Sequence, residues 1–339
     1  MDILIYFLKT IAKQTLTSDD INAFAQQDND IKIRFFELIE RHKLEYLFYS
    51  LIKNLEVESL FDQSIISEYF NKLNVHQSKY IEYLNSMKPI FENLEEKKIK
   101  YAVLKGFSFM DELYNTNIGL TRRFVDIDVL IDKSDLKEAK EILNNYNFVQ
   151  GKIVDGSIVR PERKDLIYWE LNSHQLYEYV KLSEYTSQYW IEVDINTTIF
   201  EGGKFVPPIE TKILLTHSVI KKTELGISFY VLNKTFSLLQ LCYHFYKDTV
   251  YETKKENHND YCLIKFCDIR EFILHFRKEI DWSEFVKIVN EFNIGDQIYY
   301  SLYLVSSFYG DLGIEEILKE IKTTPLFSIG FLDWERMLL

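Results

Sequence analysis

The chain has 339 residues, 47% of them hydrophobic, which is enough for a sizeable core over two or three structural units and excludes a disordered protein. Its 52 acidic and 40 basic residues give a formal net charge of −12, so nucleic acid, which binds basic surfaces, is not an expected partner. The three cysteines lack metal-site spacing, which predicts reduced thiols in a cytoplasmic protein. Neither a signal peptide nor an apolar run of about 20 residues is recognisable, so we expect neither export nor a membrane span.

Residues 1–98 are predicted to be helical. A segment at Ser18–Asp20 is typical of a helix start, and the apolar spacing over 31–55 indicates a helix with one buried face. A long helix from about Ile65 to Leu94 then leads into the first strand. His42 and His76 are interpreted as surface or helix-packing histidines.

Residues 101–131 carry the pattern around which the rest is arranged. Tyr101–Leu104 is predicted to be a strand that ends in a turn at Gly106, with a helix over 107–114. Residues 125–131 alternate, so that Asp126 and Asp128 share one face of a strand whose other face is apolar. Two carboxylates on such a strand are costly to bury alone, and a divalent metal ion would explain both. The alternative is a solvated face of an edge strand.

The next segment adds further strands and a helix. Ser134 is predicted to cap a helix with a buried stripe from Leu136, and the Asp155-Gly156 pair predicts a hairpin. Residues 166–170 are a strand candidate, and 172–188 are ambiguous. Residues 190–196 alternate again, which places Glu192, Asp194 and Asn196 on one face.

The remainder is predicted to be a linker followed by helices. Glycines and prolines over 202–208 indicate the linker. Helices are predicted over 234–250, 260–277, 282–293, 296–309 and 314–322. The chain is therefore divided into an N-terminal helical region over 1–98, an α/β core over 99–205 and a C-terminal helical domain over 206–339.

The run Leu104-Lys105-Gly106, then Arg122, then Asp126-Ile127-Asp128-Val129-Leu130-Ile131 resembles the bacterial "uncharacterised nucleotidyltransferase" family of the DNA polymerase beta-like nucleotidyltransferase superfamily. The resemblance implies an α+β fold, in which a polymerase beta-like mixed sheet lies between N-terminal and C-terminal helical regions. It also implies a site for Mg²⁺ or Mn²⁺ that transfers a nucleotidyl group from a nucleoside triphosphate, with ATP expected.

The resemblance also implies roles for particular residues. Asp126, Asp128 and Asp194 match the family's catalytic, metal-binding acids, and Glu192 either replaces Asp194 or supports it. Asn196 departs from the histidine that is common near this position. The resemblance further suggests cofactor-binding residues, which are Lys105, Gly106, Ser108 and Arg122 for phosphate and His244 and Asp268 for the nucleotide or acceptor pocket. For His244 and Asp268, the alternative is a satisfied pair in the helical core.

Two functions follow from this resemblance. The first is a transferase that moves a nucleoside monophosphate, with AMP expected, to a hydroxyl of a small molecule, peptide or protein. The alternative is a low-turnover nucleotide-binding or antitoxin-like accessory protein that keeps the fold. The intact set of acids favours the enzyme.

Overall fold

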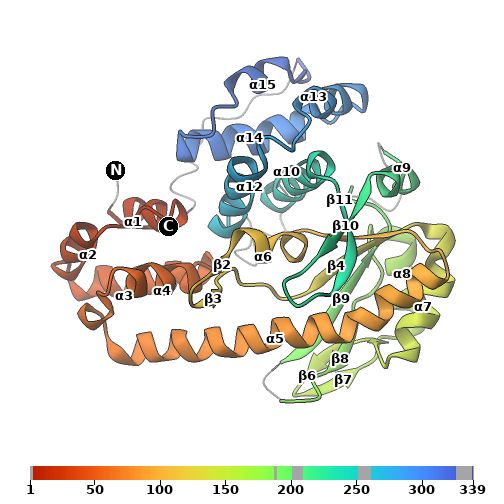
Figure 1. Ribbon diagram of the computed structural model, residues 1–339, viewed down its shortest axis with the longest axis horizontal. Coiled ribbons are helices and arrows are strands. Elements are labelled where there is room, and N and C mark those ends of the chain that lie inside the picture. Colours follow the sequence, from red (N-terminus) through yellow and green to blue (C-terminus); the bar gives the residue numbers. More distant parts are fainter. Residues whose placement is uncertain (1–2, 187–188, 201–208, 251–260, 326–337, 339) are drawn as a thin grey trace. The chain divides into compact units, whose positions relative to one another are not determined.

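The structure is a computed structural model that describes residues 3–186, 189–200, 209–250, 261–325 and 338 (Figure 1). It divides into two compact units, each assembled from segments that are far apart in the sequence. We call them the helical unit, residues 1–77, 112–123 and 241–339, and the sheet unit, residues 78–111 and 124–240. The division into three consecutive regions remains a prediction.

The helical unit begins with helices packed around phenylalanine rings. Phe7, Phe24, Phe35 and Phe48 lie with neighbouring ring centroids 4.5–6.1 Å apart. The elements are α1 Ile3–Ala12, α2 Ser18–Ala25, α3 Asn29–Arg41, α4 Glu45–Asn54, the 3₁₀ turn η1 Glu58–Leu60 and the first part of α5 Gln63–Glu96. The predicted helical character of this region is confirmed, and α5 continues through Pro89.

Side-chain caps mark two of the helix starts, and one of them differs from the prediction. Thr17, not Ser18–Asp20, is the N-cap of α2, since its hydroxyl accepts from the Asp20 N–H while the Asp20 carboxylate accepts from the Thr17 N–H. This reciprocal pair satisfies two N–H groups that the helix leaves unbonded. Asp281 caps its helix in the predicted place, by accepting from the Glu284 N–H at 2.9 Å.

The C-terminal helices were predicted within a few residues of their observed ends. They are α10 Lys234–Val250, which starts in the sheet unit, and α12 Leu263–Phe276, α13 Trp282–Glu291, α14 Gly295–Tyr309 and α15 Glu315–Glu320. Cys242, Cys262 and Cys267 are buried free thiols, as predicted. Among the described helices, none is both long and apolar enough to cross a membrane.

The sheet unit is built on a mixed seven-stranded sheet with the order β10-β11-β1-β4-β9-β8-β5. Its strands are β1 Tyr101–Leu104, β4 Ile127–Ile131, β5 Val149–Gln150, β8 Tyr179–Leu182, β9 Trp190–Asn196, β10 Ser218–Lys222 and β11 Ser228–Leu232. The central strand β4 is antiparallel to β1 and parallel to β9, so the fold is α+β, as predicted. Figure 1 shows β4 and β9 side by side.

Smaller elements connect these strands. They are the turns η2 Gly106–Ser108 and η3 Lys133–Asp135, the helices α6 Met110–Leu113, α7 Leu136–Asn145, α8 Arg163–Asn172 and α9 Thr211–Thr216, the hairpin β6 Lys152–Val154 with β7 Ser157–Val159, and, in the helical unit, the pair β2 Asn115–Thr116 with β3 Gly119–Leu120. The Asp155-Gly156 hairpin is confirmed, with both residues at positive φ. Asp132 rather than Ser134 caps the turn that precedes α7.

Two sequence predictions for this unit were wrong. Residues 166–170 belong to helix α8, not to a strand; a short apolar run fits either structure until its packing is known. The sheet also continues past residue 205, because β10 and β11 were not predicted, and β11 pairs with β1. The predicted linker over 202–208 lies outside the described residues.

Candidate active site in the sheet unit

Two aspartates lie next to each other on the central strands of the sheet. β4 and β9 are parallel neighbours in a register that pairs Asp128 with Asp194, so their side chains leave the same face. Asp128 is 2% exposed and Asp194 8%. Since β4 is paired on both sides, the alternative of a solvated edge strand is wrong.

Asp128 is held by two side chains that donate to the same carboxylate oxygen. Lys105 Nζ lies 2.6 Å from Asp128 Oδ1, and Asn196 Nδ2 lies 3.0 Å from that oxygen. The attraction of Asp128, Asp126 and Asp194 raises the Lys105 pKa in spite of burial, so Lys105 is a cation here. Asn196, which departs from the family pattern, therefore fixes the orientation of one of the acids.

Asp194 is less well satisfied than Asp128. Its Oδ2 accepts from Gln175 Nε2 at 3.2 Å, whereas its buried Oδ1 has no hydrogen-bond partner among the described residues. Burial raises its pKa well above the usual value, and repulsion from Asp126 and Asp128 adds to the effect. The Asp194 carboxylate thus lies where negative charge is costly without a positive partner.

Glu192 lies two residues earlier on the same face of β9. Burial, with repulsion from Asp126, raises its pKa to about 7, and Trp190 Nε1 donates to its carboxylate at 3.2 Å. The register aligns Asp194, not Glu192, with Asp128. Glu192 therefore extends the acidic face toward Asp126, which lies just before β4.

Tyr83 on α5 connects the two acidic strands, a role that sequence reasoning missed. Its hydroxyl donates to the Val125 carbonyl at 2.8 Å and accepts from the Glu192 N–H at 2.7 Å. It thereby ties the backbone before Asp126 to that of Glu192. No sequence signal identifies a contact between residues this far apart in the chain.

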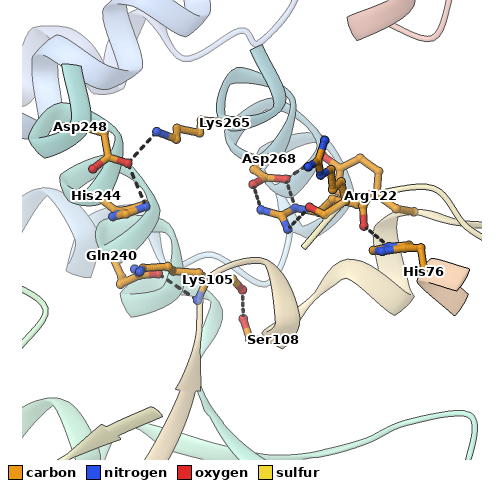
Figure 2. A network of polar contacts seen from close by, with 11 residues as sticks. His76, Lys105, Ser108, Arg122, Gln240, His244, Asp248, Lys265 and Asp268 are labelled. Carbon is orange, nitrogen blue, oxygen red and sulfur yellow. Dashed lines mark hydrogen bonds and ion pairs between the residues drawn. The ribbon is translucent and has the colours of Figure 1, made fainter. Parts of the chain in front are cut away.

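The turn that carries Lys105 has a strained backbone. Lys105 adopts φ 55° and ψ −150°, a region that is nearly restricted to glycine. Figure 2 shows how it is held: its N–H donates to Gln240 Oε1 at 3.3 Å, and its carbonyl accepts from the Ser108 hydroxyl at 2.7 Å. Gly106 opens a three-residue 3₁₀ turn, and the helix predicted over 107–114 is confirmed only for α6 Met110–Leu113. Phosphate binding by Gly106 and Ser108 stays a prediction.

Within the helical unit, Arg122 and Asp268 form a bidentate ion pair. Arg122 Nε and Nη2 lie 2.7 and 2.5 Å from the two carboxylate oxygens, and the Tyr114 hydroxyl donates to Oδ1 at 3.0 Å. The Arg122 carbonyl also accepts from His76 Nε2 at 2.8 Å (Figure 2). Both residues were predicted to bind cofactor; their mutual pairing was not anticipated.

His244 has a different acidic neighbour from the one considered in the sequence. Its Nε2 lies 3.3 Å from Asp248 Oδ2, one turn further along α10, and Lys265 Nζ lies 2.6 Å from the same oxygen (Figure 2). Asp268 is instead the partner of Arg122. The alternative, a pair between His244 and Asp268 in the helical core, is therefore wrong about the partners. Each of the two residues instead pairs with another polar side chain.

The donor set of the sheet unit suits a hard divalent cation. Asp126, Asp128, Asp194 and Glu192 offer only carboxylate oxygens, and the buried Asp194 Oδ1 has no hydrogen-bond partner within the described ranges. In the described part of the chain, however, no three His, Cys, Asp or Glu side chains are arranged so that they could hold a metal ion. The donors fit Mg²⁺ or Mn²⁺ in chemistry, and the ammonium of Lys105 lies among them.

Comparison with known proteins agrees with the sequence resemblance. No protein of curated function matches the chain. The family model described as "Uncharacterised nucleotidyltransferase" matches residues 32–310, which include both acidic strands and the Lys105 turn. The chain therefore belongs to the uncharacterised nucleotidyltransferase family.

Proposed function

We propose that the chain is a cytoplasmic, metal-dependent transferase that moves a nucleoside monophosphate from a nucleoside triphosphate to a hydroxyl of a small molecule, peptide or protein. AMP from ATP is the expected donor group. The observation that carries the proposal is the buried pair Asp128 and Asp194, adjacent on central strands, with one Asp194 oxygen left unbonded by the part of the chain that the structure describes. In a polymerase beta-like fold, such acids belong to the catalytic centre.

The acids would hold Mg²⁺ or Mn²⁺, which when bound neutralises charge that develops on the phosphate oxygens. Asp126 and Asp128 would be ligands of this ion, and Asp194 or Glu192 would complete the set. The acceptor oxygen bonds to the α-phosphorus, the bond from that phosphorus to the bridging oxygen breaks, and pyrophosphate leaves. Asp194, whose buried Oδ1 accepts no hydrogen bond from the described residues, is the group proposed to take the hydroxyl proton.

The test is pyrophosphate release with the four triphosphates, Mg²⁺ or Mn²⁺, and a cell extract as the source of acceptor. Asp126→Asn is expected to lower the rate by roughly a hundredfold or more, because it removes a carboxylate from charge stabilisation in the transition state. Triphosphate affinity without metal should weaken much less, since the Asp126 carboxylate does not attract phosphate.

The matched control is Asp132→Asn, at the turn after the same strand. Asp132 accepts from the Ser134 N–H as a cap, so this variant should keep wild-type turnover. Equal turnover in Asp126→Asn and wild type would contradict the proposed site. Nucleotide binding by the wild type without turnover would favour the accessory protein, and absence of nucleotide binding would leave only the fold.

A further inference from the structure

Positive charge already lies among the acids of the sheet unit. The Lys105 ammonium is 2.6 Å from Asp128 Oδ1, and the Asp128 side chain is 3% exposed. Asp126 and Asp194 also attract this ammonium. Buried carboxylates destabilise a fold unless an opposite charge accompanies them, so this ammonium supplies compensation that the acids need.

The backbone that delivers this ammonium is strained. A non-glycine residue at φ 55° and ψ −150° is strained, and this conformation persists only where the surroundings hold it. Gln240 and Ser108 bond the peptide groups on either side of Lys105. Such strain is concentrated at sites where a residue has to change partners or stay pre-organised. The side chain is also 22% exposed, so it has room to leave Asp128.

We propose that Lys105 is an internal counter-cation, which neutralises Asp128 when no metal is bound and competes with the divalent cation for that carboxylate. The inference rests on the proposed function, because the competing ion is the one that nucleotidyl transfer requires. Metal entry then requires the ammonium to withdraw, and the site exchanges one cation for another instead of filling an empty negative pocket.

The test measures Mn²⁺ binding to the full chain without nucleotide, by the electron paramagnetic resonance signal of free Mn²⁺. Lys105→Met removes the competing ammonium, so the variant should bind Mn²⁺ roughly tenfold more tightly than wild type. This factor lies within the usual range by which one bound group changes the affinity for another. The variant's Tm in EDTA should be lower than wild type, because the acids lose their cation. Saturating Mn²⁺ should then restore the lost stability.

The chain offers a closely matched control in Lys265. Its ammonium is also 2.6 Å from a buried aspartate, Asp248, and its exposure is similar, but it lies in the helical unit. Lys265→Met should lower the Tm without raising Mn²⁺ affinity, and Mn²⁺ should not restore its Tm. Lys105→Arg, which keeps the charge, should bind Mn²⁺ no more tightly than wild type.

A second measurement covers the case in which Lys105→Met does not fold. In wild type carrying ¹³Cε-lysine, Mg²⁺ should shift the Lys105 resonance and leave that of Lys265 in place. If Mg²⁺ binds and the Lys105 resonance does not move, the competition is refuted while the proposed function stands. The competition is equally refuted if Lys105→Met folds and binds Mn²⁺ with wild-type affinity. If neither wild type nor Lys105→Met binds Mn²⁺, the metal-dependent function itself fails.

Discussion

His42 is buried at the end of α3, with both ring nitrogens bonded to backbone groups. Its Nδ1 accepts from the Leu263 N–H at 3.3 Å, which leaves the proton on Nε2, where it donates to the Leu338 carbonyl at 2.7 Å. Burial lowers the His42 pKa to about 4. The interpretation of His42 as a helix-packing histidine is confirmed. A neutral ring that bonds two backbone groups needs no catalytic or binding role to explain its position.

The lowered pKa of His42 predicts that the folded protein loses stability in mild acid. The unfolded chain takes up the proton near pH 6.5 and the folded chain only near pH 4, so folding is penalised as the pH falls through this window. The expected loss is about 3 kcal/mol of unfolding free energy, from 1.36 kcal/mol per pKa unit. Urea unfolding of wild type and His42→Gln between pH 4 and 8 should show a shallower pH dependence in the variant. His275→Gln, at an exposed position of α12, is the control, and equal slopes in wild type and His42→Gln would refute the assignment.

At the scale of elements, α5, β4 and β9 are joined by one buried hydroxyl. Tyr83 is fully buried and bonds the Val125 carbonyl and the Glu192 N–H. Removing the hydroxyl takes from the Glu192 N–H its acceptor and from the Val125 carbonyl one of its two donors, the other being Lys79 Nζ at 2.8 Å. Because Val125 precedes Asp126, the position of an acid on β4 depends on this contact with a helix.

Tyr83→Phe should lower the unfolding free energy by about 1–3 kcal/mol, the cost of leaving the Glu192 N–H without this acceptor. Under the proposed function it should also slow pyrophosphate release by roughly tenfold, as expected when a catalytic group is slightly misplaced. Tyr101→Phe is the control: this tyrosine is equally buried, but its hydroxyl donates to Glu95, away from the acids. A Tyr83→Phe variant with wild-type kinetics would show that Val125 needs no such anchor.

The sequence predicted elements well where a local pattern determines them. The alternation over 190–196 gave β9 at its observed bounds, because a half-polar strand has period two. The strand prediction over 166–170 was wrong because α8 has scarcely any apolar face. Tyr168 and Leu171 are each 65% exposed, so the hydrophobic pattern shows neither the helical period of 3.6 residues nor the strand period of two. β10 and β11 were not predicted, because the glycines and prolines over 202–208 indicate a linker and thus an end of the sheet.

The sequence identified the acids but not their partners. Asp128 and Asp194 follow from two similar strands, and the parallel register makes them neighbours. Lys105 was expected to meet phosphate, and its ion pair with Asp128 follows only from the pairing of β1 with β4. The Arg122–Asp268 pair spans 146 residues of chain, and no local pattern indicates a contact of that kind.

At the scale of the whole molecule, each compact unit is assembled from segments that are separate in the sequence. The sheet unit takes in residues 78–111 and 124–240, while residues 112–123 belong to the helical unit. Helix α5 runs from one unit into the other without interruption. Periodicity along a sequence identifies elements, but it contains no information on which elements share a core, so these two units could not be predicted from it.

The net charge of the whole chain bears on the acceptor. A protein that binds nucleic acid gains affinity by neutralising phosphates and releasing counterions, which an excess of acidic residues opposes. We expect no binding of a single-stranded RNA or DNA oligonucleotide to the chain, at either about 0.15 M or about 0.01 M salt, where screening is weakest. Gel mobility shifts at both salt concentrations measure this directly.

The same oligonucleotides, added to a pyrophosphate-release assay, should not raise the rate above that with triphosphate alone. Small hydroxyl compounds or peptides from a cell extract should raise it, because neutral or cationic acceptors meet no general repulsion from a chain of net charge −12. Removing nucleic acid from the extract with nuclease is the control and should leave the stimulation intact. Binding that weakens steeply with salt, or stimulation that nuclease abolishes, would mean that a local basic surface outweighs the overall charge and that the acceptor is nucleic acid.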